Sequence, residues 1–188
     1  MLVSEIVPAD RYDPTTIRLH WLTAILVILL WASAQVVDYF PKGTPRITAR
    51  SLHITTGVAL ALAFAYRLWW RQQGGRCLPP AGSGALQFLS QAIHIGLYTL
   101  LLVELVLGFA NAWIRGDSIF ALFTIPAFDP GNAALRDLVE KMHGLVANII
   151  LSVAGLHAAA ALAHHFVWRD GVLQRMFNRS LAQRNSPA

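Results

Sequence analysis

Histidine is the residue type in this 188-residue sequence best suited to chemistry, because a neutral imidazole binds metal ions and exchanges protons near neutral pH. All seven histidines lie within or at the edge of a long apolar segment: His20, His53, His94, His143, His157, His164 and His165. An ionisable side chain is expensive inside a membrane, so its presence there indicates a functional role. We therefore ask which elements position these side chains.

Four apolar segments must position the histidines, and each is long enough to cross a bilayer as a helix. They span residues 17–37, 51–70, 88–113 and 142–166. About 20 helical residues cross a hydrocarbon core of about 30 Å. Proline and glycine residues punctuate all three connections between the segments. The sequence therefore predicts an all-α fold, an integral membrane four-helix bundle, as a single domain over residues 1–188.

Composition agrees with a membrane protein whose main surroundings are lipid. Hydrophobic residues make up 55% of the chain and charged residues only 13%, whereas soluble chains carry about 25% charged residues. The net charge of +5 comes from Lys and Arg in short segments between the apolar runs. This distribution favours the charge bias that orients membrane helices and predicts no nucleic-acid partner.

The basic residues also predict the orientation of the bundle. Nine lie on the side that holds both termini and the second connection: Arg11, Arg18, Arg67, Arg71, Arg76, Arg169, Arg175, Arg179 and Arg184. Six lie on the other side: Lys42, Arg46, Arg50, Arg115, Arg136 and Lys141. The positive-inside rule then places both termini in the cytoplasm.

The spacing of four histidines predicts two pairs at two depths. His143 and His157 lie 157 − 143 = 14 residues apart in the fourth segment, a rise of about 21 Å that returns to within about 40° of the same stripe. His53 opens the second segment at the depth of His143, and His20 lies early in the first segment, at the depth of His157. We therefore expect an outer pair, His53 with His143, and an inner pair, His20 with His157.

Each pair would offer two neutral imidazoles from different helices, which suits the two axial positions of haem iron. Gly57, Gly144 and Gly155 lie close to these histidines and leave room for a flat group. The sequence thus predicts two b-type haems, with no C-x-x-C-H motif for covalent attachment and only one cysteine. Two alternatives stay open: hydrogen bonds between helices, and a zinc site, for which no compact H-E-x-x-H cluster is present.

Three further polar residues lie at the depth of the inner pair or between it and the cytoplasmic face. Arg67 follows His53 by 14 residues and could bind a haem propionate, or simply extend to the membrane surface. His94 in the third segment could compete with His20 as a ligand or line a quinone pocket. His164, two turns beyond His157, could donate a hydrogen bond or proton to a quinone, or contact lipid headgroups.

Glu104 lies in the middle of the third segment, and the sequence identifies no partner for it. An acid at this depth is either neutral or paired, and it could belong to a proton path. The third segment therefore contributes no favoured ligand, and His94 and Glu104 are its unexplained polar residues.

Several of these residues belong to longer strings. They are Ile17-Arg18-Leu19-His20-Trp21, Leu52-His53, Arg67-Leu68 and the fourth-segment run 155–165, GLHAAAALAHH, followed by Trp168, Asp170 and Arg175-Met176. Together these strings resemble the bacterial cytochrome b561 family, and within it the superoxide oxidases. The resemblance covers nearly the whole chain, and the fourth-segment string is its most specific part.

The resemblance implies a four-helix bundle in the bacterial inner membrane with two b haems that pass electrons to ubiquinone. It implies that His20 and His157 ligate one haem, that His53 and His143 ligate the other, and that His164 lies at the quinone site. For the superoxide oxidases it implies superoxide as the electron donor on the periplasmic side.

The leading hypothesis is an oxidoreductase with no catalytic residues beyond the haems, because the cofactor carries the electron chemistry. The outer cations could steer superoxide or fix the helix ends at the interface: Lys42, Arg46, Arg50, Arg115 and Lys141. One alternative is an electron-transfer subunit that relays electrons from a periplasmic redox partner to quinone. Another is a histidine-based metal transporter, which a visible spectrum without b-type bands would favour.

Overall fold

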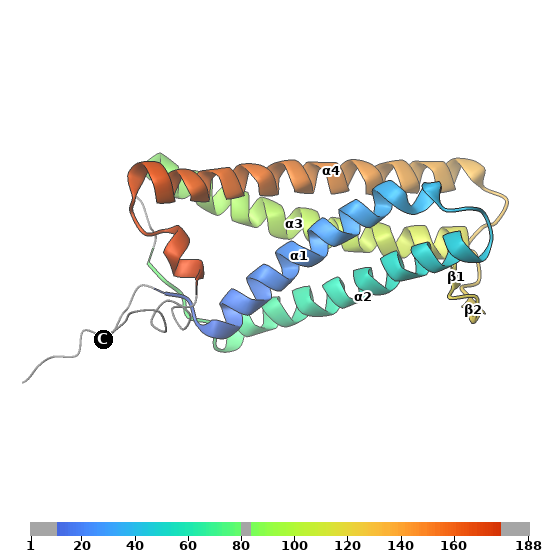
Figure 1. Cartoon of the computed structure of the whole chain (residues 1–188), viewed down its shortest axis with the longest axis horizontal. Helices are drawn as coiled ribbons and strands as arrows, with labels where there is room; N and C mark the ends of the chain where they lie inside the picture. Colours follow the sequence, from blue (N-terminus) through green and yellow to red (C-terminus); the bar gives the residue numbers. More distant parts are fainter. Residues whose placement is uncertain (1–10, 80–83, 178–188) are drawn as a thin grey trace, which may run out of the picture.

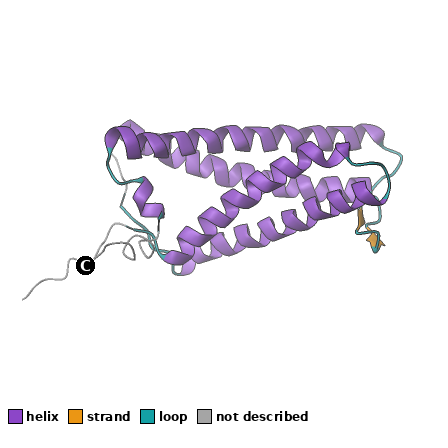
Figure 2. Ribbon diagram, viewed as in Figure 1, coloured by secondary structure: helices purple, strands orange, loops and turns teal. Residues whose placement is uncertain are grey.

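The computed structural model describes residues 11–79 and 84–177, and within them four long helices run up and down as an antiparallel bundle (Figures 1 and 2). These helices are α1 (Pro14–Val36), α2 (Thr44–Gln73), α3 (Gly84–Arg115) and α4 (Ala133–Ala163). All four are long and apolar enough to cross a membrane, which confirms the predicted fold class. Arg179 and Arg184, counted among the cytoplasmic cations, lie outside the described residues.

The two ends of the bundle carry different short elements. At one end, strands β1 (Ser118–Ile119) and β2 (Phe123–Thr124) form an antiparallel hairpin between α3 and α4. We call this the hairpin end. At the other end α4 continues into one turn of π-helix, His164–Trp168, followed by a 3₁₀ turn, Leu173–Met176. We call this the π-helix end. A further 3₁₀ turn, Val37–Tyr39, extends α1 at the hairpin end.

The helices pack mainly as two pairs, α1 against α2 and α3 against α4, and the two pairs contact each other less. Leu60 and Phe64 of α2 and Leu101 of α3 form a buried apolar cluster between the two helix pairs. Many large apolar side chains point outward, such as Leu62 of α2 and Val106 of α3. A soluble bundle would bury such residues, whereas a membrane bundle exposes them to lipid.

All four helices begin earlier than the apolar segments predict, and two of them begin seven or more residues earlier. α2 begins at Thr44 instead of residue 51, and α4 begins at Ala133 instead of residue 142. The added turns of α4 carry charged side chains. A search for apolar segments excludes such residues, but a helix that projects beyond the bilayer can contain them. The prediction that His53 and His143 open their helices is therefore wrong. They lie 53 − 44 = 9 and 143 − 133 = 10 residues inside, about 14–15 Å along the helix.

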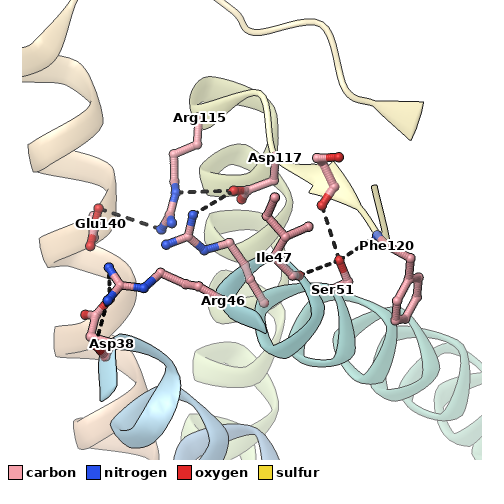
Figure 3. Close-up of polar contacts among 10 residues, drawn as sticks. Asp38, Arg46, Ile47, Ser51, Arg115, Asp117, Phe120 and Glu140 are labelled. Carbon is pink, nitrogen blue, oxygen red and sulfur yellow. Dashed lines mark hydrogen bonds and ion pairs between the residues drawn. The ribbon is translucent and has the colours of Figure 1, made fainter. Parts of the chain in front are cut away.

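A fully buried serine joins the β-hairpin to α2 (Figure 3). The Oγ atom of Ser51 lies 2.7 Å from the carbonyl oxygen of Ile47 and accepts a hydrogen bond from the backbone N–H of Phe120 at 2.8 Å. Phe120 and Ala121 have φ values of 51° and 57°, the left-handed conformation that a tight hairpin turn requires at both central residues. The loop after α3 is thus fixed against the start of α2.

A carboxylate performs the equivalent role at the π-helix end. Asp13 caps α1 through the backbone N–H of Thr16 at 2.9 Å, and it also accepts hydrogen bonds from Trp70 Nε1 and the N–H of Arg76. Burial alone would raise the pKa of Asp13, but these hydrogen bonds outweigh it and lower the pKa to about 2. Asp13 therefore connects the start of α1 with the end of α2.

Candidate functional site

The structure brings His53 of α2 and His143 of α4 together in the half of the bundle near the hairpin end. Their ring centroids are 6.3 Å apart and their ring planes are inclined at 86°. Both side chains are mostly shielded from the surroundings, since neither residue is exposed. This juxtaposition is the outer pair that the sequence predicts.

The hydrogen bonding of His53 fixes which ring nitrogen is free. Its Nδ1 lies 2.8 Å from the Oγ of Ser33 on α1, and that hydroxyl also lies 2.8 Å from the carbonyl oxygen of Leu30. A hydroxyl has one hydrogen, which it donates to the carbonyl, so Oγ accepts from the Nδ1–H of His53. Nε2 then keeps its lone pair for a metal. Ser33 could not be selected from the sequence, because its contact with His53 depends on the crossing of α1 and α2.

His143 lies between its own helix and two residues of α3. Its Nδ1 is 3.1 Å from Oε1 of Glu104, in a close contact that departs from hydrogen-bond alignment. One turn farther along α3, a Cβ atom at Gly108 would lie only 3.3 Å from Cε1 of His143. The ring therefore fills the space that Gly108 leaves open, and Glu104, which had no partner in the sequence, lies against a predicted ligand.

The second pair lies in the half of the bundle near the π-helix end. The ring centroids of His20 on α1 and His157 on α4 are 6.4 Å apart, with ring planes inclined at 69°. His94 of α3 is closer to His157, with a centroid separation of 5.0 Å. The structure thus groups three histidines here, as the sequence allowed, but at two different separations.

Arg67 of α2 also reaches this group. Its Nη2 lies 3.3 Å from Nδ1 of His20, and its guanidinium lies 5.1 Å from the ring centroid of Tyr98 on α3. Within the described residues no carboxylate pairs with Arg67. A cation inside an apolar bundle is costly without an anion, so this arrangement suits an anionic group of a bound molecule.

His164 stands at the junction where α4 becomes π-helix. Its Nδ1 contacts Oδ2 of Asp170, and its ring lies 4.5 Å from that of Trp168. Burial would raise the pKa of Asp170, but hydrogen bonds from His164 and the N–H of Val172 lower it. A carboxylate on Nδ1 leaves Nε2 available to a ligand. Asp170 was visible in the sequence only as part of the string after α4.

Four of the six cations at the hairpin end pair with acids, whereas Lys42 and Arg136 have no such partner among the described residues; Figure 3 draws part of this network. The structure pairs Arg46 with Asp38 at 3.7 Å, Arg50 with Asp117 at 3.3 Å, Arg115 with Asp117 at 3.6 Å and with Glu140 at 3.7 Å, and Lys141 with Asp137 at 2.7 Å. Asp117 is nearly buried and bridges α2 and α3. These acids reduce the field that the cations exert on an approaching anion.

Comparison with known proteins places this architecture in a family. The model of the prokaryotic cytochrome b561 family matches residues 11–179. The chain belongs to this family. A probable superoxide oxidase of Yersinia pestis, CybB, is 30% identical over 168 residues, which cover 88% of this chain and 95% of that protein.

Two Escherichia coli K12 proteins are also similar to this cytochrome b561 chain. Cytochrome b561 homolog 1 is 30% identical over 174 residues, which cover 90% of this chain and 98% of the homolog. Cytochrome b561 homolog 2 is 28% identical over 177 residues, covering 91% and 93%. The four apolar helices and the family make this chain a bacterial membrane electron-transfer protein.

A b-type haem, which the cytochrome b561 family implies, fits the two wider histidine pairs. Two imidazoles that bind one iron from opposite sides, each at about 2.0 Å, place their ring centroids about 6.3 Å apart. The separations of 6.3 and 6.4 Å match this distance, whereas His94 and His157 at 5.0 Å are too close. A Cβ atom at Gly57, one turn from His53, would meet no atom within 4 Å, so that face has room for a bulky group.

Proposed function

We propose that this cytochrome b561 protein is a superoxide:ubiquinone oxidoreductase that holds two b haems. His53 and His143 would bind the haem near the hairpin end, and His20 and His157 the haem near the π-helix end. The observation that carries the proposal is the pair of centroid separations, 6.3 and 6.4 Å, at two depths of one helix. The similarity to a probable superoxide oxidase supports the choice of donor.

The proposed reaction balances as two superoxide anions, one ubiquinone and two protons giving two dioxygen molecules and one ubiquinol. Each superoxide loses one electron, and the quinone gains two electrons with the two protons. The haems, when bound, supply the one-electron chemistry. The chain supplies the ligands, and α4 spaces the two histidines that belong to different pairs by about 21 Å.

The orientation assigned to the bundle follows from the same proposal. The hairpin end would face the periplasm, where superoxide arrives, and the π-helix end with the two chain termini would face the cytoplasm, as the positive-inside rule predicts. The ion pairs at the hairpin end imply that steering of superoxide by the paired cations is weak.

At the π-helix end, His164 and Asp170 would serve the quinone. Asp170 accepts the hydrogen bond of the Nδ1–H of His164 and so leaves Nε2 facing the quinone; after the ring takes up a second proton, its Nε2–H can donate a hydrogen bond and then that proton to the quinone oxygen. Arg67, without a carboxylate partner among the described residues, would pair with a propionate of the neighbouring haem, and its contact with His20 would then be exchanged for that anion.

A stopped-flow experiment on purified protein in detergent tests the proposal. Superoxide should reduce the haem bands rapidly, and a soluble quinone should reoxidise them. Absence of fast haem reduction by superoxide would contradict the proposed donor.

The variant His164→Ala should slow the quinone step by about 10²-fold, the usual contribution of a positioned proton donor, while superoxide still reduces the haem. His165→Ala, one residue along and without the Asp170 contact, is the matched control. Loss of haem from His164→Ala would show that the role given to His164 is wrong.

A second candidate is an electron-transfer subunit that relays electrons from a periplasmic redox protein to quinone. The mixture of paired cations and acids at the hairpin end favours this candidate, because a surface of alternating charges is better suited to bind a protein than to attract a small anion. Protein that is slowly reduced by superoxide but rapidly by a periplasmic electron carrier would support this candidate.

A further inference from the structure

Glu104 is the one acid of α3 that the structure places deep in the bundle against a proposed haem ligand. Its side chain is only 14% exposed, and its Oε2 is buried without a hydrogen-bond partner. An acid in this position is costly, and no basic side chain other than an imidazole contacts it among the described ion pairs. A cost of this kind points to a function for the contact.

The contact of Glu104 with His143 has the polarity that metal ligation through Nε2 requires. When Nε2 binds a metal, the imidazole proton resides on Nδ1, and this atom lies 3.1 Å from a carboxylate oxygen. Gly108 lets the ring approach α3 closely enough for the contact, since its Cβ would lie 3.3 Å from Cε1 of His143. The two atoms are close but not aligned as a hydrogen bond, so Glu104 favours a proton on Nδ1 of His143 through the negative charge of its carboxylate.

None of the other three proposed ligands has a carboxylate beside its ring among the hydrogen bonds and ring contacts of the described residues. Within the described residues, Nδ1 of His53 faces the neutral hydroxyl of Ser33, and Nδ1 of His20 faces the cationic Arg67. The ring of His157 lies beside that of His94. A carboxylate beside the Nδ1–H of a ligand raises the basicity of that ligand and favours the more positive, ferric state of the iron.

We propose that Glu104 is a positioning residue for His143 and that its carboxylate gives the hairpin-end haem the lower midpoint potential of the two. This inference rests on the proposed function, because it presupposes a haem at each histidine pair. An electron moves spontaneously toward the higher midpoint potential. The negative charge beside His143 and the positive charge beside His20 therefore favour the transfer of one electron at a time from the hairpin end toward the π-helix end. Two such electrons complete the reduction of the quinone.

A spectroscopic redox titration of the full-length protein in detergent tests the order of the potentials. The wild-type protein should titrate as two haem components, and His53→Ala should remove the one with the lower midpoint. Removal of the higher component would overturn the inference. A wild-type haem content below two per chain would instead contradict the proposed function, so the two failures are distinguishable.

The variant Glu104→Gln tests the residue itself, because it keeps the size of the side chain and removes the charge. The lower midpoint should move to a more positive potential while the higher one stays in place. Glu140→Gln is the matched control, since Glu140 is 58% exposed, pairs with Arg115 and lies one turn before His143 on α4; its shift should be smaller. Equal shifts in the two variants, or a shift of the higher midpoint in Glu104→Gln, would overturn the inference.

The variant Glu104→Asp covers the case in which Glu104→Gln fails to retain the hairpin-end haem. A retained carboxylate should then restore both the haem and its low midpoint. Failure of this rescue would overturn the role of the charge, because loss of packing alone would explain the glutamine variant.

Discussion

The two histidine pairs have nearly the same separation but opposite surroundings. At the hairpin end, Nδ1 of His53 faces a hydroxyl acceptor and Nδ1 of His143 faces a carboxylate. At the π-helix end, Nδ1 of His20 faces the donor groups of Arg67. Two acceptors favour the tautomer that carries its proton on Nδ1 and leaves Nε2 free. The guanidinium is a donor, so it favours the tautomer with the proton on Nε2 until it pairs with an anion. The hairpin-end pair is therefore set for metal binding by the protein alone, and the π-helix-end pair needs a change at Arg67.

The largest expected effect separates the two ends by removing one ligand of each. His143→Ala and His157→Ala should each lower the haem content from about two to about one per chain, because each breaks one pair. The haem of the intact pair should remain and titrate with a single midpoint. Haem extraction and a redox titration measure both quantities, with His165→Ala as the control. Two haems retained in His143→Ala would contradict the assignment of His143 as a haem ligand.

The next variants ask which histidine faces His157 across the iron. His20→Ala should lose the π-helix-end haem, because its ring lies at the bridging separation of 6.4 Å. His94→Ala should keep that haem, because a ring at 5.0 Å is too close to share an iron with His157. The content and absorption spectrum of the haem decide between them. Haem lost from His94→Ala and kept in His20→Ala would reverse the assignment.

A smaller effect is expected from crowding the hairpin-end ring. Gly108→Ala should weaken haem retention there by about 1 kcal/mol, the low end of the cost of overpacking, because the new methyl group would lie 3.3 Å from His143. Gly96→Ala on the same helix is the matched control, since its Cβ would meet nothing within 4 Å. The temperature at which the haem band is lost measures the difference. Identical behaviour of the two variants would show that Gly108 does not support the ring.

The smallest expected effect concerns the fold at the π-helix end. Asp13→Asn keeps a capping side chain but removes the charge, so it should destabilise the protein at neutral pH by less than about 1 kcal/mol. The folded pKa of about 2 lies below the ordinary value of 3.8, so the charge contributes stability above pH 3.8, and this contribution is lost as the pH falls toward 2. Thermal unfolding at several pH values should show the gap between variant and wild type closing on acidification. A constant gap would contradict the cause given for the low pKa.

Much of the fold was predictable because each membrane helix must satisfy its own backbone and face lipid with apolar side chains. The four apolar segments lie inside α1 to α4, apart from a few residues at two helix ends, and the fold class is confirmed. The helix starts at Thr44 and Ala133 were missed, because a hydropathy window stops at charged residues that a projecting helix tolerates. The ligand assignments, supported by the distances, stay a proposal.

The sequence by itself determined the number of spanning helices, the family and the spacing of 14 residues that sets His143 and His157 at two depths. These properties follow from composition and from the fixed rise and turn of a helix. Only the tertiary structure decided what faces each imidazole: Ser33, Glu104, Arg67 and Asp170 reach their partners across other helices or around a turn. The rotation of one helix about its axis relative to another depends on packing between distant segments, and so the local sequence does not contain it.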